Sequence, residues 1–414
     1  MKITRFTFLL ICCFWGVELQ AQTGYNTNAI PLGNKESLMG NTGTGGVASA
    51  GATYYNPGAL TQLEGSSISL SGAAYTRFEF AASPFFKQGD TELDYQGQGF
   101  QSIPTSAVML KSWKNWRLGF SVLIPMKFKY EGVENWSPVL YGERYDIEVE
   151  QSYEEQMMLI GLSAARKLND KWSVGVSGFA QAYSQYSSIK TEFLLEDQYE
   201  VSSSREKYAP YSLRFIAGVL REEERWSVGA SVSFPDIYMS GKGDYKSTLA
   251  SGTDSTSSYL EVISFSGEKA HVQNPFECRI GGNYKATEKW KIAVDFVYTT
   301  PVEYNVFDYP EYNETHKLTE TYRFSLGNEI QVQDDVYAYL GASYVPTPTS
   351  DANYDNRYSF FSATTGFRKV TEHVESTIGL FYAKGSGKTD SGYGFTTEET
   401  FVYYGVFLGT SYVF

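Results

Sequence analysis

The chain has 414 residues, a net charge of −13 and 16% aromatic residues, while its mean hydropathy is only −0.31. It is longer than one ordinary soluble core, and its acidic charge argues against nucleic-acid binding. Many aromatic residues at low mean hydropathy are typical of a β-barrel that faces lipid outside and water inside.

The N-terminus has the parts of a secretory signal peptide. Two basic residues are followed by an apolar run over residues 6–17, and Leu-Gln-Ala at 19–21 resembles a cleavage site. We therefore predict a signal peptide over residues 1–21 and a mature chain that starts at Gln22. No later run approaches the 18 apolar residues that a membrane-spanning helix needs. Such an exported chain is soluble, surface-attached or a β-barrel.

Residues 22–64 precede the first predicted strand and are rich in small side chains. The stretch GNTGTGGVASAGATYYNPGAL covers residues 40–60. Its bare backbone cannot lie in lipid, because its amide groups would be unsatisfied there. It is therefore either a periplasmic tail or a plug inside a barrel. Its apolar residues favour the plug, since a disordered tail would have fewer, and its glycines allow close packing in a narrow lumen.

Beyond residue 64 one unit recurs: a strand, a short charged turn and a second strand. The six turns lie at residues 111–120, 165–176, 220–230, 284–294, 329–341 and 367–379. Five tryptophans sit at these turns: Trp113, Trp116, Trp172, Trp226 and Trp290. Tryptophan at successive turns is typical of the aromatic girdle of a membrane barrel.

The strand after each turn alternates between apolar and small or polar residues. After Trp226, Val228 and Val232 share one face, while Ser227 and Ser231 share the other. Period-two alternation with one apolar face predicts strands with a lipid-facing side. The polar side predicts a lumen with water or polar contents. The pattern has exceptions on the predicted inner face: Leu123, Phe179, Tyr403 and Phe407.

The hairpins can be counted. Six hairpins, one strand that starts near Gly65 and a final strand over 399–414 give about 14 strands, so we predict an all-β, antiparallel transmembrane barrel over residues 65–414. The terminal Phe414 resembles the signal read by the barrel assembly machinery, which we expect as a partner. Seven longer connections are predicted at the other end: 81–100, 128–150, 186–207, 240–270, 303–320, 346–356 and 384–398.

The stretch SLMGNTGTGGVASAGATYYNPGAL (residues 37–60) resembles the N-terminal hatch of the FadL/TodX outer-membrane transporters for long-chain fatty acids and other hydrophobic compounds. Members carry Asn-Pro-Ala before the first strand, where this chain has Asn56-Pro57-Gly58. The resemblance implies a hatch over residues 22–64 inside the lumen and a location in the outer membrane of a Gram-negative bacterium. It also implies passive uptake of a hydrophobic small molecule by a monomer, without cofactor or metal, among outer-membrane lipid and lipopolysaccharide.

The resemblance further implies where the ligand binds. Capture is expected at the extracellular loops, where Ile189, Phe193 and Leu194 lie near helical spacing in the predicted loop 186–207. Packing against a neighbouring loop is the alternative for this apolar face. Beside the hatch, Tyr54 and Tyr55 are the expected ligand contacts.

A lateral exit through the third strand is also implied. That strand covers about residues 116–130, and Gly119 and Pro125 fall on its predicted inner face. Proline cannot donate a ladder hydrogen bond, so Pro125 is a candidate for a gap. The alternative is that it marks a strand end, because Pro235 and Pro301 lie at similar offsets after Trp226 and Trp290.

Other functions were weighed. An enzyme is not expected, because the three histidines, His271, His316 and His373, fall in predicted loops or turns without a nucleophile partner. A general diffusion porin is expected to lack the segment before the first strand. A barrel of this type that serves as a structural or protein-secretion component remains an alternative, since no motif in the chain excludes it.

Overall fold

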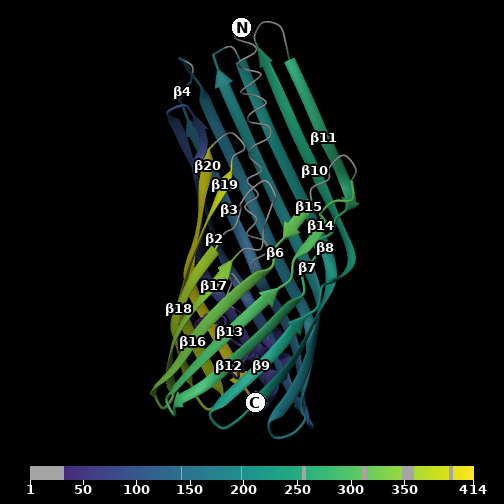
Figure 1. Cartoon of the computed structure of the whole chain (residues 1–414), viewed down its shortest axis with the longest axis vertical. Helices are drawn as coiled ribbons and strands as arrows, with labels where there is room; N and C mark the ends of the chain where they lie inside the picture. Colours follow the sequence, from purple (N-terminus) through teal and green to yellow (C-terminus); the bar gives the residue numbers. More distant parts are fainter. Residues whose placement is uncertain are drawn as a thin grey trace.

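The computed structural model describes residues 32–414 except 141, 197, 254–257, 310–314, 347–358 and 391–394, and its strands close into one tall barrel (Figure 1). The predicted signal peptide lies outside the described residues. The strands are β1 (Ser67–Gln88), β2 (Thr91–Trp113), β3 (Trp116–Trp136), β4 (Val139–Leu140), β5 (Glu143–Arg144), β6 (Asp146–Lys167), β7 (Trp172–Leu195), β8 (Gln198–Glu222), β9 (Trp226–Ser233), β10 (Ile237–Thr253), β11 (Ser258–Lys269), β12 (Glu277–Thr287), β13 (Trp290–Thr299), β14 (Val302–Asn305), β15 (Thr315–Leu318), β16 (Thr321–Gln333), β17 (Val336–Pro346), β18 (Ser359–Val370), β19 (Val374–Asp390) and β20 (Thr396–Val413).

The main sheet is antiparallel and closed. Its sixteen strands make fourteen positions around the wall, because β9 and β10 are two pieces of one barrel strand, as are β11 and β12. β8 pairs with β9 along one part of its length and with β10 along the rest. β1 pairs with β20 from Ser67↔Val413 to Ser83↔Glu398, which closes the ring. The predicted 14-stranded barrel is confirmed.

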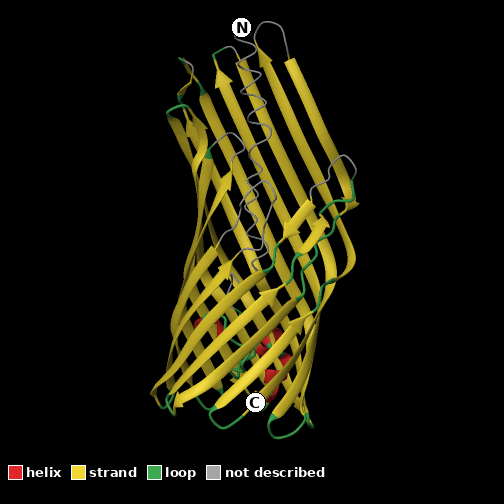
Figure 2. Ribbon diagram, in the orientation of Figure 1, coloured by secondary structure: helices red, strands yellow, loops and turns green. Residues whose placement is uncertain are grey.

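The alternation of the sequence is realised as two faces of the wall. Val228 on β9 is 47% exposed on the outer side, whereas Ser231 is 3% exposed on the inner side. Six tight turns join strands at one end of the barrel, where the sequence placed them (Figure 2). The five tryptophans at these turns are between 38% and 54% exposed, as a girdle at the membrane boundary requires.

The predicted long connections were largely wrong, because most of these residues form strand. β7 runs to Leu195 and β8 starts at Gln198, so the predicted loop 186–207 is a hairpin. Similarly, β1 and β2 replace the loop 81–100. The 240–270 connection is the β10–β11 hairpin, and 303–320 carries the small sheet β14–β15. The barrel ladder continues past the membrane into water, where outward polar residues conceal the strand pattern.

The segment before β1 lies inside the barrel. It contains two short 3-10 helices, η2 (Glu36–Leu38) and η3 (Pro57–Gln62), and one α-helical turn, α2 (Ala52–Tyr55), near the end with the tight turns (Figure 2). We call residues 32–64 the plug. Wall serines donate hydrogen bonds to its carbonyl groups: Ser173 to Gly58 (3.0 Å), Ser177 to Thr53 (2.7 Å), Ser227 to Gly45 (2.6 Å) and Ser231 to Tyr55 (2.6 Å). The polar inner face therefore satisfies the backbone of the plug.

Wall glycines allow the plug to approach the strands closely. A Cβ atom at Gly341 would lie 2.0 Å from the amide nitrogen of Gly40, and one at Gly229 would lie 2.0 Å from the carbonyl oxygen of Thr44. The same holds around the ring, at Gly175, Gly218, Gly281, Gly327 and Gly409. The small residues of the inner strand faces thus match the width of the plug.

Two neighbouring glycines on β12 test this fit. A Cβ at Gly281 would lie 2.7 Å from the amide nitrogen of Gly45, whereas Gly282 faces outward with no atom nearer than 3.7 Å. We expect Gly281→Val to displace the plug at a cost of about 1–3 kcal/mol and to raise single-channel conductance in planar bilayers. Gly282→Val is the matched control and should leave conductance unchanged. Equal conductance for both variants would contradict the fit.

Candidate functional site

The ladder between β2 and β3 is interrupted. The two strands pair at Gln98↔Glu131 and again from Ser106↔Leu123 down to the turn, with no pairing in between. Seven residues on each strand, 99–105 and 124–130, therefore make no ladder pairs with each other. We call this interval the break. Backbone groups there have no ladder partner on the opposite strand. At membrane depth such groups occur only where other protein groups or a cavity satisfy them.

Each strand of the break carries a proline. Pro104 of β2 is exposed and Pro125 of β3 is buried, and neither is paired with a residue of the other strand. Neither residue has an amide proton, so neither can donate to the other strand. The sequence analysis identified Pro125 but missed Pro104, and a search for prolines at mirrored distances from a tight turn would have found the pair. Pro235 lies between β9 and β10, the two pieces of one barrel strand, and Pro301 lies between β13 and β14, whereas Pro125 lies within β3.

A bulge at the break reverses the faces of β3. Relative to β6, the register of β3 shifts between Leu123 and Met126. Beyond the shift, Met126 is fully buried on the inner side, while the Lys129 side chain is 42% exposed. Gly119 and Pro125 are both buried, and the predicted alternation of β3 fails only beyond Pro125, where one inserted residue inverts it. Gly119 lies below the break, against the plug residue Thr53.

One side chain still connects the two strands. Gln101 of β2 donates a hydrogen bond from Nε2 to the carbonyl oxygen of Lys127 on β3 (3.1 Å). This contact satisfies one of the carbonyl groups that the ladder leaves free. A side-chain bond of this kind can rearrange without disturbing the flanking ladder.

Aromatic side chains line the lumen beside the break. Phe78 lies 5.7 Å from Phe128 between ring centroids, and Phe80 lies 4.8 Å from Phe401. The group, which we call the aromatic cluster, comprises Phe78, Phe80, Phe128, Tyr130, Phe360, Phe381, Phe401 and Tyr403, on β1, β3, β18, β19 and β20. Tyr403, an exception to the predicted alternation, belongs to it. The lumen above the plug is therefore apolar along this wall, contrary to the polar lumen predicted.

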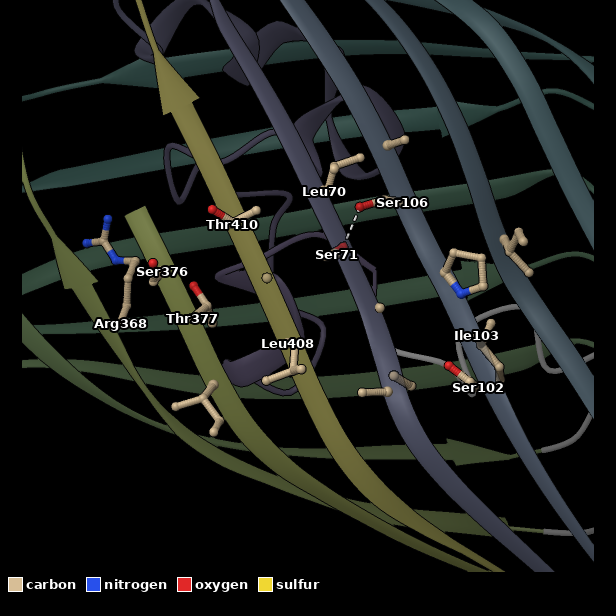
Figure 3. Close-up of a pocket in the computed structure, with 18 of the residues that line it drawn as sticks. Leu70, Ser71, Ser102, Ile103, Ser106, Arg368, Ser376, Thr377, Leu408 and Thr410 are labelled. Carbon is tan, nitrogen blue, oxygen red and sulfur yellow. Dashed lines mark hydrogen bonds between the residues drawn. The ribbon is translucent and has the colours of Figure 1, made fainter. Parts of the chain in front are cut away.

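An apolar concavity of about 950 Å³ opens beside the break on the wall of the barrel. Pro104 and Ile124 line it at the break, and it continues over β1, β20, β19 and β18 (Figure 3). Leu70 and Leu408 are about half exposed where they line it, as residues that face lipid are. A hydrophobic molecule at the break would thus have apolar surface on both sides of the wall.

The Asn56-Pro57-Gly58 motif fastens the plug. The Asn56 side chain donates from Nδ2 to the carbonyl oxygens of Thr44 (2.8 Å) and Val219 on β8 (2.9 Å), and its Oδ1 accepts from the amide of Gly58 (3.0 Å). Pro57 begins η3. A Cβ at position 58 would lie only 3.0 Å from the carbonyl oxygen of Gly218. Glycine in place of the alanine of the family motif therefore fits the close wall.

Tyr54 and Tyr55 are fully buried at the contact between plug and wall. Arg279 of β12 lies 4.9 Å above the Tyr54 ring and 5.3 Å above the Tyr55 ring, within cation–π range. Arg279 and Arg323 both form ion pairs with Glu277, and all three side chains are less than 8% exposed. In this structure the two tyrosines hold the plug, and their predicted contact with a ligand stays a prediction.

The predicted capture residues lie on a strand. Ile189, Phe193 and Leu194 belong to β7, which pairs here with both β6 and β8, so they do not form a helical face. Phe193 is buried on the inner side, and Leu194 is 47% exposed. Neighbouring residues of a strand point to opposite sides of the wall, so these two cannot share one ligand surface.

A buried carboxyl group sits inside the plug. Glu36 is fully buried between Gly33 and Gly51, and burial raises its pKa to about 7 from an ordinary value near 4.5. The charged groups nearest to it are Lys35 of the plug and Asp295 of β13, with Tyr55 also facing it. Asp295 accepts hydrogen bonds from the amides of Gly43 and Thr44 (both 2.9 Å). No group of three or more metal-binding side chains occurs among the described residues.

These features define a class of protein: an outer-membrane β-barrel with an internal plug and an interrupted wall. The family described as outer membrane protein transport protein (OMPP1/FadL/TodX) matches residues 37–358, and the chain belongs to this family. It is therefore an outer-membrane protein of a Gram-negative type of envelope. No curated protein sequence matches the chain.

Solved structures share the fold. A Pseudomonas aeruginosa FadL homologue has a TM-score of 0.62 and 14% identity, covering 93% of this chain and 99% of its own. The Ralstonia pickettii toluene transporter TbuX has a TM-score of 0.59 and 13% identity, covering 94% and 99%. The monoaromatic hydrocarbon channel CymD has a TM-score of 0.58 and 14% identity, covering 94% and 98%.

Glu36 leads to a pH prediction. Because the buried group binds its proton more tightly than a solvated one, seating of the plug is most stable below about pH 4.5 and weakens as the pH rises to 7. The change amounts to about 3 kcal/mol. Channel opening in planar bilayers should therefore become more frequent between pH 4.5 and 7, and Glu36→Gln should abolish this dependence. The exposed Glu64→Gln is the control and should retain it. Unaltered pH dependence in Glu36→Gln would refute the assignment.

Proposed function

We propose that the protein takes up hydrophobic small molecules, long-chain fatty acids or hydrocarbons, by passive diffusion and releases them sideways into the outer membrane through the break. One observation carries this proposal: the break lies between the aromatic cluster inside the barrel and the apolar concavity outside it. Membership of a transport family supports the same reading.

The lateral route has a thermodynamic reason. An apolar molecule that leaves the lumen for the periplasm would lose about 25 cal/mol for each Å² of apolar surface exposed to water. A molecule that leaves through the wall passes from aromatic side chains to lipid and avoids this loss. The plug closes the direct path, since its backbone is hydrogen-bonded to strands around the ring.

Each element has a proposed role. The aromatic cluster holds the ligand, and Phe193, with Ile189 on the same strand, lines the passage toward the cell exterior. Tyr54 and Tyr55 form the floor, and Asn56-Pro57-Gly58 keeps the plug seated. Pro125, with Pro104, holds the break open, while Leu194 faces outward and contacts the surroundings of the barrel. We further propose that the protein acts as a monomer, inserted by the barrel assembly machinery.

Two of the similar structures are a toluene transporter and a monoaromatic hydrocarbon channel, and a third is a FadL homologue. These similarities support a hydrophobic ligand in general for this chain. Mass spectrometry of molecules that co-purify with the native protein would distinguish a fatty acid from a hydrocarbon. Purification without any bound hydrophobic molecule would favour the alternative, a structural or protein-secretion component.

A disulfide across the break tests the exit. Counted from the paired rows on either side of the break, Ser102 of β2 falls at the same level as Lys127 of β3. In a Cys278→Ser background, we expect the oxidised Ser102→Cys/Lys127→Cys variant to lose at least tenfold in the rate of ligand transfer into proteoliposome membranes, because the two strands can no longer separate. Reduction should restore transfer.

The control pair lies in a continuous part of the wall. Gln156 and Ser184 face each other on β6 and β7, so Gln156→Cys/Ser184→Cys should leave transfer unchanged when oxidised. If the crosslink across the break left transfer intact, the proposed exit would be wrong. If both oxidised variants lost transfer, the effect would come from stiffening of the barrel in general and not from the break.

A further inference from the structure

β8 and β10 are neighbouring strands that lie away from β2 and β3 on the barrel wall (Figure 1). A group of basic side chains lies on their outer face. It comprises Arg205 and Lys207 on β8 and Lys242 and Lys246 on β10, all exposed. We call these four residues the basic cluster. The whole chain carries a net charge of −13, so this surface is a local exception.

The basic cluster lacks the partners that other surface cations have. Elsewhere on the barrel, exposed cations pair with a carboxylate two residues away, as in Arg77–Glu79, Lys129–Glu131, Arg144–Asp146 and Lys190–Glu192. Within the described residues, none of the four cations of the basic cluster forms an ion pair. Arg205 and Lys246 are directly opposite in the ladder. Like charges in such positions repel each other, which favours an anionic ligand between them.

One carboxylate, Asp244, lies within the basic cluster, directly opposite Lys207 in the ladder. Asp244 accepts hydrogen bonds from the Ser266 hydroxyl and from the amide of Gly267 (2.9 Å), which occupy it from the β11 side. Its charge offsets one of the four cations, so the surface keeps an excess of three positive charges. Lysine and arginine in such an arrangement suit phosphate oxygens, which accept charge-assisted hydrogen bonds.

The position of the basic cluster along the strands shows where it lies relative to the lipid-facing apolar residues. Tyr211 pairs with Ser240 two rows below the pair Lys242↔Ala209, and large apolar residues are exposed on the outer face from about this level downward. Tyr211, Ile237 and Met239 are between 54% and 59% exposed. The basic cluster therefore begins where the lipid-facing band ends. From Lys242 to Lys246 it extends about 13 Å along the strand, at about 3.3 Å per residue.

We propose that the basic cluster binds the phosphate groups of a phosphorylated glycolipid of the outer leaflet, of the lipid A type, with its acyl chains on Tyr211, Ile237 and Met239. The charges supply the phosphate contacts, and the apolar residues directly below supply a surface for the chains. The site lies on the outside of the wall and is separate from the proposed passage, so it binds an envelope lipid and not the transported molecule.

The experiment compares two charge-matched variants of the full chain. Arg205→Gln/Lys207→Gln/Lys242→Gln/Lys246→Gln removes the basic cluster, and Lys127→Gln/Lys129→Gln/Lys384→Gln/Lys388→Gln removes four cations from β3 and β19. Purified proteins are titrated with bisphosphorylated lipid A, dephosphorylated lipid A and phosphatidylglycerol, and bound lipid is counted by native mass spectrometry. Retained heat-modifiable mobility in gels shows that each barrel is folded.

For bisphosphorylated lipid A we expect at least a tenfold weaker affinity in the basic-cluster variant and no change in the control variant, since each cation near an anionic headgroup contributes about fivefold. The wild type should bind dephosphorylated lipid A and phosphatidylglycerol more weakly. Equal affinity of both variants, or equal binding of the lipid with and without phosphates, would overturn the proposal. Salt provides a second measurement on the wild type alone: affinity that does not fall with rising ionic strength would also overturn it.

Discussion

Everything in this structure depends on the need of backbone amide and carbonyl groups for hydrogen-bond partners where water is absent. The closed ladder meets this need for the wall, and the ring from β1 to β20 leaves no edge in the membrane. The plug has almost no regular structure of its own, so it meets the same need by other means. Inner serines, Asn283, Thr364 and Asp295 supply its partners. The polar inner face of the strands thereby holds the irregular backbone of the plug.

At the break, part of the backbone lacks hydrogen-bond partners on the neighbouring strand. A proline on each strand removes a donor, both strands carry a bulge near the break, and the register of β2 with β3 is the same on either side of it. The same bulge turns Phe128 and Tyr130 inward and their lysine neighbours outward. A local interruption thus has two consequences: it frees the backbone, and it exchanges which side chains face the lumen. The apolar inner surface and the opening arise from one irregularity.

The plug and the wall are mutually adapted through size and charge. Glycines on the strands admit its backbone, and the buried Glu277, Arg279 and Arg323 place a cation over its two tyrosines. Breaking one partner of such a buried ion pair is strongly destabilising, which keeps the arrangement intact. Glu36 is the opposite case, a carboxyl group enclosed by the plug itself, so its protonation is linked to how the plug is seated.

The sequence by itself determined the barrel, its approximate number of strands and the turns with their tryptophans, and it favoured a plug for the segment before the first strand. These features follow from local patterns: period-two alternation, turn residues and small side chains. Tertiary structure decided that Pro104 and Pro125 lie in one unpaired interval, that Tyr403 joins an aromatic cluster, and that Ile189 and Phe193 lie on a strand. The physical reason is that register and bulges depend on which residues of distant strands pair. One inserted residue reverses every face beyond it, and no local pattern records that insertion.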